Sequence, residues 1–280
     1  MNWSEKKRRR ARAAIGFAVS AMFANIGNAA STTWTHAGDG TWQTSANWNN
    51  GLPSSSADAI FNLANTYTVT ETANSAANSV DLSAGSLTLA LGTYQLSSTG
   101  TLSVISAAGQ SATLNLTGSG TLQTAGGVYL GLNSSGSGQN SSGTLNQLAG
   151  NLVTTGSTNF YLGVGGSSGT YNLSGGGATI GQIIIVGNDG TGQLNAAGGS
   201  INSGELWLAR NVGSAGTVTL ANSSITTGLV YIGGSDTTSG GSGTLSINGG
   251  GFRHFVNYAS APGNFGSLLN RLGVSARFPR

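Results

Sequence analysis

Few side chains in this sequence could catalyse a reaction or hold a metal ion. The 280 residues include only two histidines, His36 and His254, and no cysteine. The acidic residues after residue 30 are scattered, and no pair of them recurs at a fixed spacing. General acid–base catalysis needs two titratable groups held together, and calcium needs several oxygen ligands. The sequence therefore predicts no catalytic residue, no metal site and no cofactor.

Two short motifs resemble functional signatures. GGSSG at 165–169 fits the pattern G-x-S-x-G, but a nucleophile elbow also needs a strand-to-helix turn with histidine and acid partners. GNDGTG at 187–192 contains part of a glycine-rich calcium repeat without the tandem copies that carry further aspartates. The enzymatic alternative is a polysaccharide lyase or hydrolase whose acid–base cluster would come from Asp189, Glu205, Arg210 and Asp236.

Positive charge is concentrated at the N-terminus. Six of the 11 basic residues lie within the first twelve positions, followed by an apolar stretch at 13–26 and the small residues GNAAS. This order is typical of a secretory signal peptide, and the apolar part is shorter than the roughly 20 residues of a bilayer span. We therefore expect a signal peptide at 1–30, no transmembrane segment in the mature chain, and a secreted or outer-surface location. A retained anchor is the alternative.

The chain after residue 30 carries seven acidic residues and five arginines, a net charge of −2, and no lysine. Binding to a phosphate backbone needs several clustered Lys or Arg side chains, so nucleic acid is not an expected partner. Since no cysteine is present, disulfides do not stabilise the exported protein. The architecture itself must do so.

Two anchors repeat along the chain. One is a glycine followed by Thr or Gln and an apolar residue; it starts at Gly143, Gly169, Gly192, Gly216 and Gly243. The other reads VYLG at 128–131, FYLG at 160–163, IIVG at 184–187, LWLA at 206–209 and VYIG at 230–233. Between the anchors apolar residues alternate with polar ones, which predicts strands, and the 47 glycines suit tight corners. The sequence predicts an all-β fold, a parallel β-helix (β-solenoid) of roughly seven irregular turns.

The expected domain order follows from the repeats. Residues 31–79 would form an N-terminal cap and the first strands, with Trp34, Trp42 and Trp48 closing the open end of the stack. Residues 80–252 would form the solenoid, and residues 253–280 a divergent C-terminal tail.

The segment WTHAGDGTWQTSANWNNGLPSSSADAIF at 34–61, followed by units of the type GTYNLSGGGATI, resembles exported bacterial proteins with autotransporter-associated β-strand repeats. Many of those carry a PEP-CTERM sorting tail. The resemblance covers residues 1–252 and implies a parallel β-helix, display at the surface, and roles in adhesion or matrix. Residues 253–280 contain no PEP motif followed by an apolar span and a basic end. The sequence therefore does not predict how the protein is anchored. Residues 253–280 are either a genuine C-terminal end, a truncation or the product of a shifted reading frame.

The middle residues of the second anchor would point outward if their neighbours point inward. They are Tyr129, Tyr161, Ile185, Trp207 and Tyr231. Flat rings pack well on sugar rings, so Tyr129, Tyr161, Trp207 and Tyr231 are the candidate ligand-binding residues, and an extracellular polysaccharide or cell-surface glycan is the candidate partner. In the structural alternative this row only stabilises the sheet by cross-strand contacts or is covered by a loop.

A second outward row contains Asn115, Asn146, Asn172 and Asn195, continued by Thr219 and Ser246. Stacked amides bond from turn to turn, so we expect a structural ladder, with contact to a polar ligand as the alternative. Taken together, the sequence favours a non-enzymatic, secreted or cell-surface structural or adhesive β-helix protein. A polysaccharide-binding module that uses the aromatic row is the second hypothesis, and the lyase or hydrolase is the third.

Overall fold

The computed structural model describes residues 30–105, 111–132, 141–235 and 238–254. Residues 1–29 of the expected signal peptide (1–30) and residues 255–280 of the expected tail (253–280) lie outside the described residues, so the inferences about them stay predictions. Within the described ranges, no helix has both the length and the apolar character needed to cross a membrane.

The described chain is all-β, and its strands form the three faces of a coil. Face I is a nine-stranded parallel sheet with the order β2 (Gly40–Thr41), β4 (Thr66–Thr70), β7 (Gly85–Ala90), β10 (Ser111–Thr117), β13 (Ser142–Gln147), β16 (Ser168–Leu173), β18 (Thr191–Ala196), β20 (Ala215–Leu220) and β22 (Ser242–Ile247).

Faces II and III are the two arms of a fourteen-stranded sheet. Face II contains β5 (Ser75–Ala77), β8 (Gln95–Ser98), β11 (Thr121–Thr124), β14 (Asn151–Thr154) and β23 (Gly250–His254). Face III contains β1 (Ala30–Thr33), β3 (Ala57–Phe61), β6 (Val80–Leu82), β9 (Leu102–Val104), β12 (Val128–Leu132) and β15 (Phe160–Val164). Three longer strands run through both arms: β17 (Gly177–Val186), β19 (Ser200–Leu208) and β21 (Ser223–Ile232).

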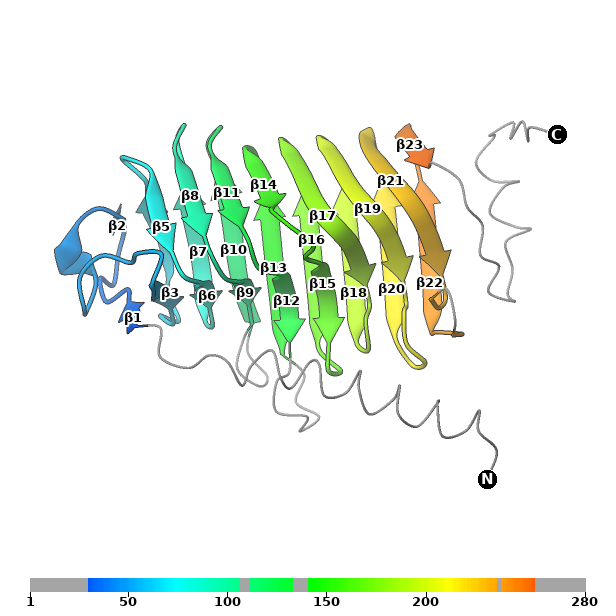
Figure 1. The fold of residues 1–280 in the computed structure, drawn as a ribbon, viewed down its shortest axis with the longest axis horizontal. Helices are drawn as coiled ribbons and strands as arrows, with labels where there is room; N and C mark the ends of the chain where they lie inside the picture. The colour runs from blue at the N-terminus through cyan, green and yellow to red at the C-terminus, as the bar shows by residue number, and fades with distance from the viewer. Residues whose placement is uncertain (1–29, 106–110, 133–140, 236–237, 255–280) are drawn as a thin grey trace, which may run out of the picture. The chain divides into compact units, whose positions relative to one another are not determined.

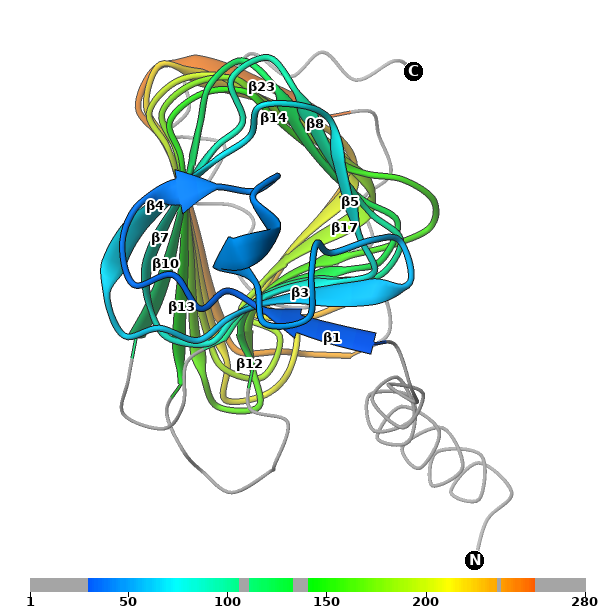
Figure 2. The ribbon, with the colours of Figure 1, turned by 90° about the vertical axis from the view of Figure 1, so that its left-hand side faces the viewer.

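Each turn crosses face I, then face II, then face III, and the next turn lies parallel to it (Figure 1). The view along the coil shows the three faces enclosing one interior (Figure 2). The predicted parallel β-solenoid is confirmed, with about eight turns rather than seven. The first complete turn runs from β4 to β6, so the stack begins before residue 80.

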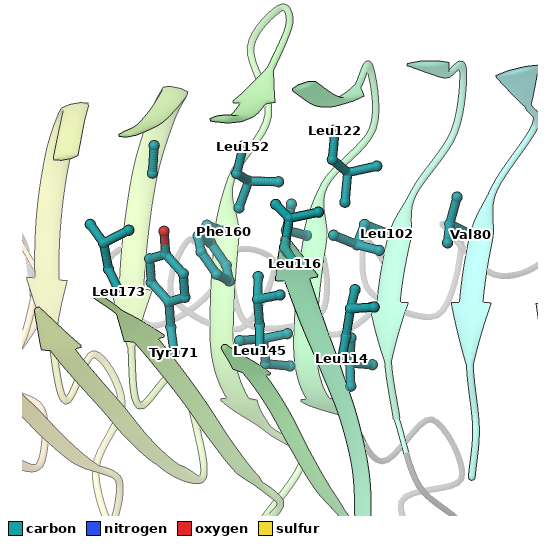
Figure 3. Close-up of a cluster of buried hydrophobic side chains, with 14 of the residues drawn as sticks. Val80, Leu102, Leu114, Leu116, Leu122, Leu145, Leu152, Phe160, Tyr171 and Leu173 are labelled. Carbon is teal, nitrogen blue, oxygen red and sulfur yellow. The ribbon is translucent and has the colours of Figure 1, made fainter. Parts of the chain in front are cut away.

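The interior is built from rows of apolar side chains in register. Leu114, Leu145, Tyr171 and Leu194 pair in sequence from β10 to β18 and are fully buried. Figure 3 shows such side chains converging from several turns. A single turn could not bury its apolar side alone, so the stability of the stack is close to a sum over neighbouring turns.

The interior also holds one satisfied polar pair. Tyr171 donates a hydrogen bond from its hydroxyl to Gln147 Oε1 at 2.6 Å, and Gln147 Nε2 donates to the carbonyl oxygens of Gly150 and Gly177 at 2.9 and 2.8 Å. Burial raises the pKa of the Tyr171 hydroxyl. Because these buried groups have partners, they avoid the penalty of unsatisfied polar atoms.

Glycine is favoured at both anchors for different reasons. The second anchor ends in a left-handed residue: φ is 65° at Gly131, 74° at Gly163, 79° at Gly187 and 75° at Gly233. In LWLA the same place is taken by Ala209 with φ 54°. At the first anchor the requirement is space, since a Cβ on Gly169 would collide with the carbonyl oxygen of Leu130.

The N-terminal end of the coil is closed by aromatic side chains. Trp34, Trp42 and Trp48 are 0, 2 and 4% exposed, and the ring centroids of Trp42 and Trp48 lie 4.9 Å apart. Trp48 donates its indole N–H to the carbonyl oxygen of Trp42 at 2.9 Å. The short 3-10 helix η1 (Ser45–Asn47) belongs to this blue segment, which crosses the near end of the coil in Figure 2. The predicted Trp-rich cap is confirmed.

Candidate functional site

The predicted aromatic row lies on the outside of face III. Its five members pair from turn to turn in register: Tyr129, Tyr161, Ile185, Trp207 and Tyr231. Their neighbours Leu130, Leu162 and Leu206 are fully buried in the interior. The five side chains of the row therefore point away from the interior, as the sequence predicted.

The expectation that this whole row is exposed is wrong for three of its members. Ile185 is fully buried, and Trp207 and Tyr231 are only 9 and 8% exposed. They form a second apolar cluster outside the main core, against which Tyr161, Ile183 and Leu229 pack. Sequence reasoning missed Ile183 and Leu229, although Ile183 and Ile185 alternate in the run IIIV. Two successive outward apolar residues indicate a face that is covered.

The ring faces in this row are used within the protein. Tyr129 and Tyr161 stack almost parallel, with centroids 5.1 Å apart and an interplanar angle of 4°. Trp207 meets Tyr231 edge-on at 5.3 Å, and the Arg210 guanidinium carbon lies 4.8 Å from the Trp207 ring centroid. Burial, and then the neighbouring Tyr161, raise the pKa of Tyr129 to about 12. These contacts match the cross-strand stabilisation that aromatic pairs give to sheets.

A shallow hollow lies beside this row where faces II and III meet. The strand register shifts there between Ile180 and Ile183. The hollow has a volume of about 210 Å³ and is lined by Gly181, Gln182, Ile183, Gly204, Glu205 and Leu229. The Glu205 carboxylate accepts a hydrogen bond from the Trp207 indole at 2.6 Å. The hollow therefore combines the Glu205 carboxylate with the apolar side chains of Ile183 and Leu229.

The structure brings only part of the proposed acid–base cluster together. Glu205 and Arg210 both contact Trp207, and Arg210 also donates to Asn188 Oδ1 at 3.3 Å. Asp189 instead supports a corner, since its Oδ1 accepts the Gly165 amide at 2.6 Å. Asp236 lies outside the described residues. Among the residues with described positions, no three His, Cys, Asp or Glu side chains gather to hold a metal ion.

The other acidic side chains sit at the N-terminal end. Glu71 is 2% exposed, and burial raises the pKa of its carboxyl to about 7. Ser79 Oγ lies 2.8 Å from Asp58 Oδ1 and 2.5 Å from Asp81 Oδ2, so one hydroxyl joins two carboxyl groups. Burial is the main cause that raises the pKa of Asp81, and the nearby Asp58 adds to it. His36 is exposed, with its ring edge-on to Trp34. The side chain of His254 lies outside the described part.

The predicted asparagine ladder is present on the outside of face I. Asn146 donates to Asn115 at 2.8 Å, Asn172 donates to Asn146 at 2.8 Å, and Asn195 donates to Asn172 at 2.9 Å. Thr219 and Ser246 continue the same row in register. The ladder keeps its register although successive members are separated by 31, 26 and 23 residues. Differences in turn length are therefore absorbed between the strands.

Compared with known proteins, the chain matches no protein-family model, no curated protein sequence and no solved structure. The resemblance to autotransporter-associated repeats and PEP-CTERM proteins stays a prediction.

Proposed function

We propose that this chain is an exported, non-enzymatic structural protein whose solenoid acts as a rigid adhesive or matrix-forming module at the cell surface. The observation that supports this most directly is the continuous register of the outer rows. Every turn adds one residue to each row, as in the ladder from Asn115 to Asn195. A surface of this kind repeats one weak contact many times, and repeated contacts give avidity without any single strong site.

The dimensions suit such a role. About eight turns, stacked at about 4.8 Å each, give a stack roughly 40 Å long. Each turn is held by its two neighbours, and the N-terminal end is closed by the Trp34–Trp42–Trp48 cluster. A module stabilised in this way needs no disulfide outside the cytoplasm.

Three acidic side chains that could do chemistry make hydrogen bonds within the fold. Asp189 accepts a backbone amide from the preceding turn, Glu71 accepts from Gln43 and Ser75, and Glu205 accepts from Trp207. Each of these bonds has a structural use, which favours a structural role over catalysis. The expected signal peptide and the resemblance to exported repeat proteins point in the same direction.

Cell fractionation tests the proposal. A tag placed after residue 31 should be found on the outer surface or in the medium, on a chain that has lost residues 1–30. A variant without residues 1–30 is the control and should stay in the cytoplasm and no longer support attachment of the cells. An unprocessed wild-type chain that stays in the cytoplasm would contradict export, and equal attachment with and without the protein would contradict adhesion.

A second candidate function is polysaccharide binding at the hollow beside Glu205. The hollow combines a carboxylate with the apolar side chains of Ile183 and Leu229, and sugars offer hydroxyl donors beside apolar C–H faces. Calorimetry with soluble neutral polysaccharides should detect binding that Glu205→Gln weakens and that Thr179→Ala, an exposed change on face II, leaves intact. Equal affinity in both variants would remove the hollow as the site. Turnover of a polymer, lost in Glu205→Gln, would instead favour a lyase or hydrolase.

A further inference from the structure

The outside of face I carries a regular grid of uncharged side chains. One row contains Thr66, Ser86, Thr113, Thr144, Thr170, Gln193, Thr217 and Thr244. Two residues further along each strand, a second row contains Thr68, Thr88, Asn115, Asn146, Asn172, Asn195, Thr219 and Ser246. The strands of this face contain no Asp, Glu, Lys, Arg or His.

The spacing of this grid is fixed in both directions. Turns repeat at about 4.8 Å, and residues two apart on a strand lie about 6.6 Å apart. The pairing runs residue for residue from β4 to β22, whereas the register on the other sheet shifts between Ile180 and Ile183. Face I is therefore the regular face of the solenoid.

The two rows differ in how much of their hydrogen bonding is used inside the protein. The amide row is tied together by the bonds from Asn146, Asn172 and Asn195. By contrast, the hydroxyls of Thr113, Thr144 and Thr170 make no hydrogen bond to any described residue. The three side chains are partly exposed. The ladder uses the asparagine amides. The threonines suit strands through their β-branched side chains, but no hydrogen bond to a described residue uses these three hydroxyls.

Two properties of a partner decide whether it can bind such a grid: its charge and the rigidity of its surface. The strands from β4 to β22 carry no charge, and the exposed Asp39 lies at the edge of the grid, where it accepts the Thr68 amide. Such a face has little attraction for anionic or cationic polymers. A flexible neutral polymer would lose conformational freedom on binding, and each new hydrogen bond would only replace one to water. A rigid lattice of hydroxyl groups loses no such freedom and meets many side chains at once. The face also lacks the outward aromatic rings that would pack on sugar rings.

We propose that the outside of face I binds the surface of ice crystals. Ice is a rigid, uncharged lattice of water molecules that presents donors and acceptors at a fixed repeat. Threonine methyl groups beside the hydroxyls would order water in the same repeat and join it to the crystal. This inference goes beyond the proposed function and requires only the folded solenoid, so its test on purified protein is independent of export.

The test measures ice affinity and thermal hysteresis with the purified full chain. The wild-type protein should be enriched in slowly grown ice and should lower the freezing point below the melting point. Thr170→Arg places a long charged side chain in the middle of the grid and should abolish both effects. Thr179→Arg makes the same exchange at an exposed position on face II, and it should leave both effects unchanged.

Far-ultraviolet circular dichroism establishes that each variant is folded, and Thr217→Arg replaces Thr170→Arg if the latter does not fold. Folded wild-type protein that is excluded from ice like serum albumin would overturn the proposal. Equal losses in the face I and face II variants would overturn the assignment to face I. Adsorption to crystalline cellulose without enrichment in ice would also overturn it, since the lattice recognised would then be a polysaccharide.

Discussion

Glu71 should make the N-terminal end of the solenoid less stable as the pH rises. Its Oε2 accepts hydrogen bonds from Gln43 Nε2 at 2.7 Å and Ser75 Oγ at 2.5 Å, while its Oε1 is buried without a partner in the described chain. Burial raises the pKa of the carboxyl from its ordinary 4.5 to about 7, against the smaller lowering effect of the two hydrogen bonds. The folded protein therefore keeps a proton that the unfolded chain releases at lower pH.

The sign and size of the effect follow from linkage. Because the folded state binds this proton more tightly, stability from this group is fully present below pH 4.5 and is lost as the pH rises through 7. One pKa unit corresponds to about 1.4 kcal/mol, so a shift from 4.5 to about 7 corresponds to a loss of about 3 kcal/mol. That is a large part of the roughly 5–15 kcal/mol by which domains are stable.

Glu71→Gln removes the proton exchange and nearly keeps the side-chain shape. Urea unfolding, followed by the fluorescence of the cap tryptophans, measures the free energy of unfolding at pH 4.5 and pH 8. The contribution of Glu71 should fall by about 3 kcal/mol between the two. Glu71→Gln lacks this contribution, so its stability should fall by about 3 kcal/mol less than that of the wild type. Asp39→Asn, at an exposed acid that accepts the Thr68 amide, should keep the wild-type slope. A change between the two pH values that is equal in the wild type and in Glu71→Gln would refute this reasoning.

Three further substitutions, with Thr219→Ala as a control, test the packing of the stack by thermal and urea unfolding. Ala209→Gly should raise the free energy of unfolding by about 0.5–1 kcal/mol, because a left-handed backbone costs an alanine about 1–2 kcal/mol; a loss of stability would contradict this. Asn146→Ala breaks two ladder bonds and should cost about 1–2 kcal/mol, whereas Thr219→Ala in the same row should cost less. Trp48→Ala should cost about 3–5 kcal/mol by opening a cavity in the cap, and a smaller change than in Asn146→Ala would refute a packed cap.

The alternation of apolar and polar residues and the spacing of the two anchors were enough to predict the fold, because stacked turns impose the same requirements at each repeat. An inward position such as Leu145 must meet an apolar residue on the next turn, here Tyr171. The glycines of the two anchors occur where a Cβ would collide with the neighbouring turn or where the backbone is left-handed. Constraints that repeat leave a pattern in the sequence. The ladder from Asn115 to Asn195 was predictable for the same reason.

What the sequence did not predict depends on single contacts between faces. The alternation placed Trp207 and Tyr231 outside, but their burial comes from Ile183 and Leu229 on the adjoining row and from Arg210 folding back over the indole. The bend within β17, β19 and β21 creates that arrangement, and each strand has a glycine there, Gly181, Gly204 and Gly228. The burial of Glu71 likewise depends on Gln43, which is distant in sequence and belongs to the cap.

Inward and outward residues of the solenoid make different contacts, so substitutions at the two kinds of position should have different effects. A change to an inward residue or to the cap alters the contact between neighbouring turns, so its cost appears in stability. A change in the threonine row on the outside of face I, such as Thr170, leaves both the interior contacts and the asparagine ladder intact. Loss of binding without loss of stability is therefore the property that distinguishes a working surface on this fold from a structural row. Since Ile185 is buried and Arg210 lies over Trp207, we expect substitutions in the aromatic row to lower stability.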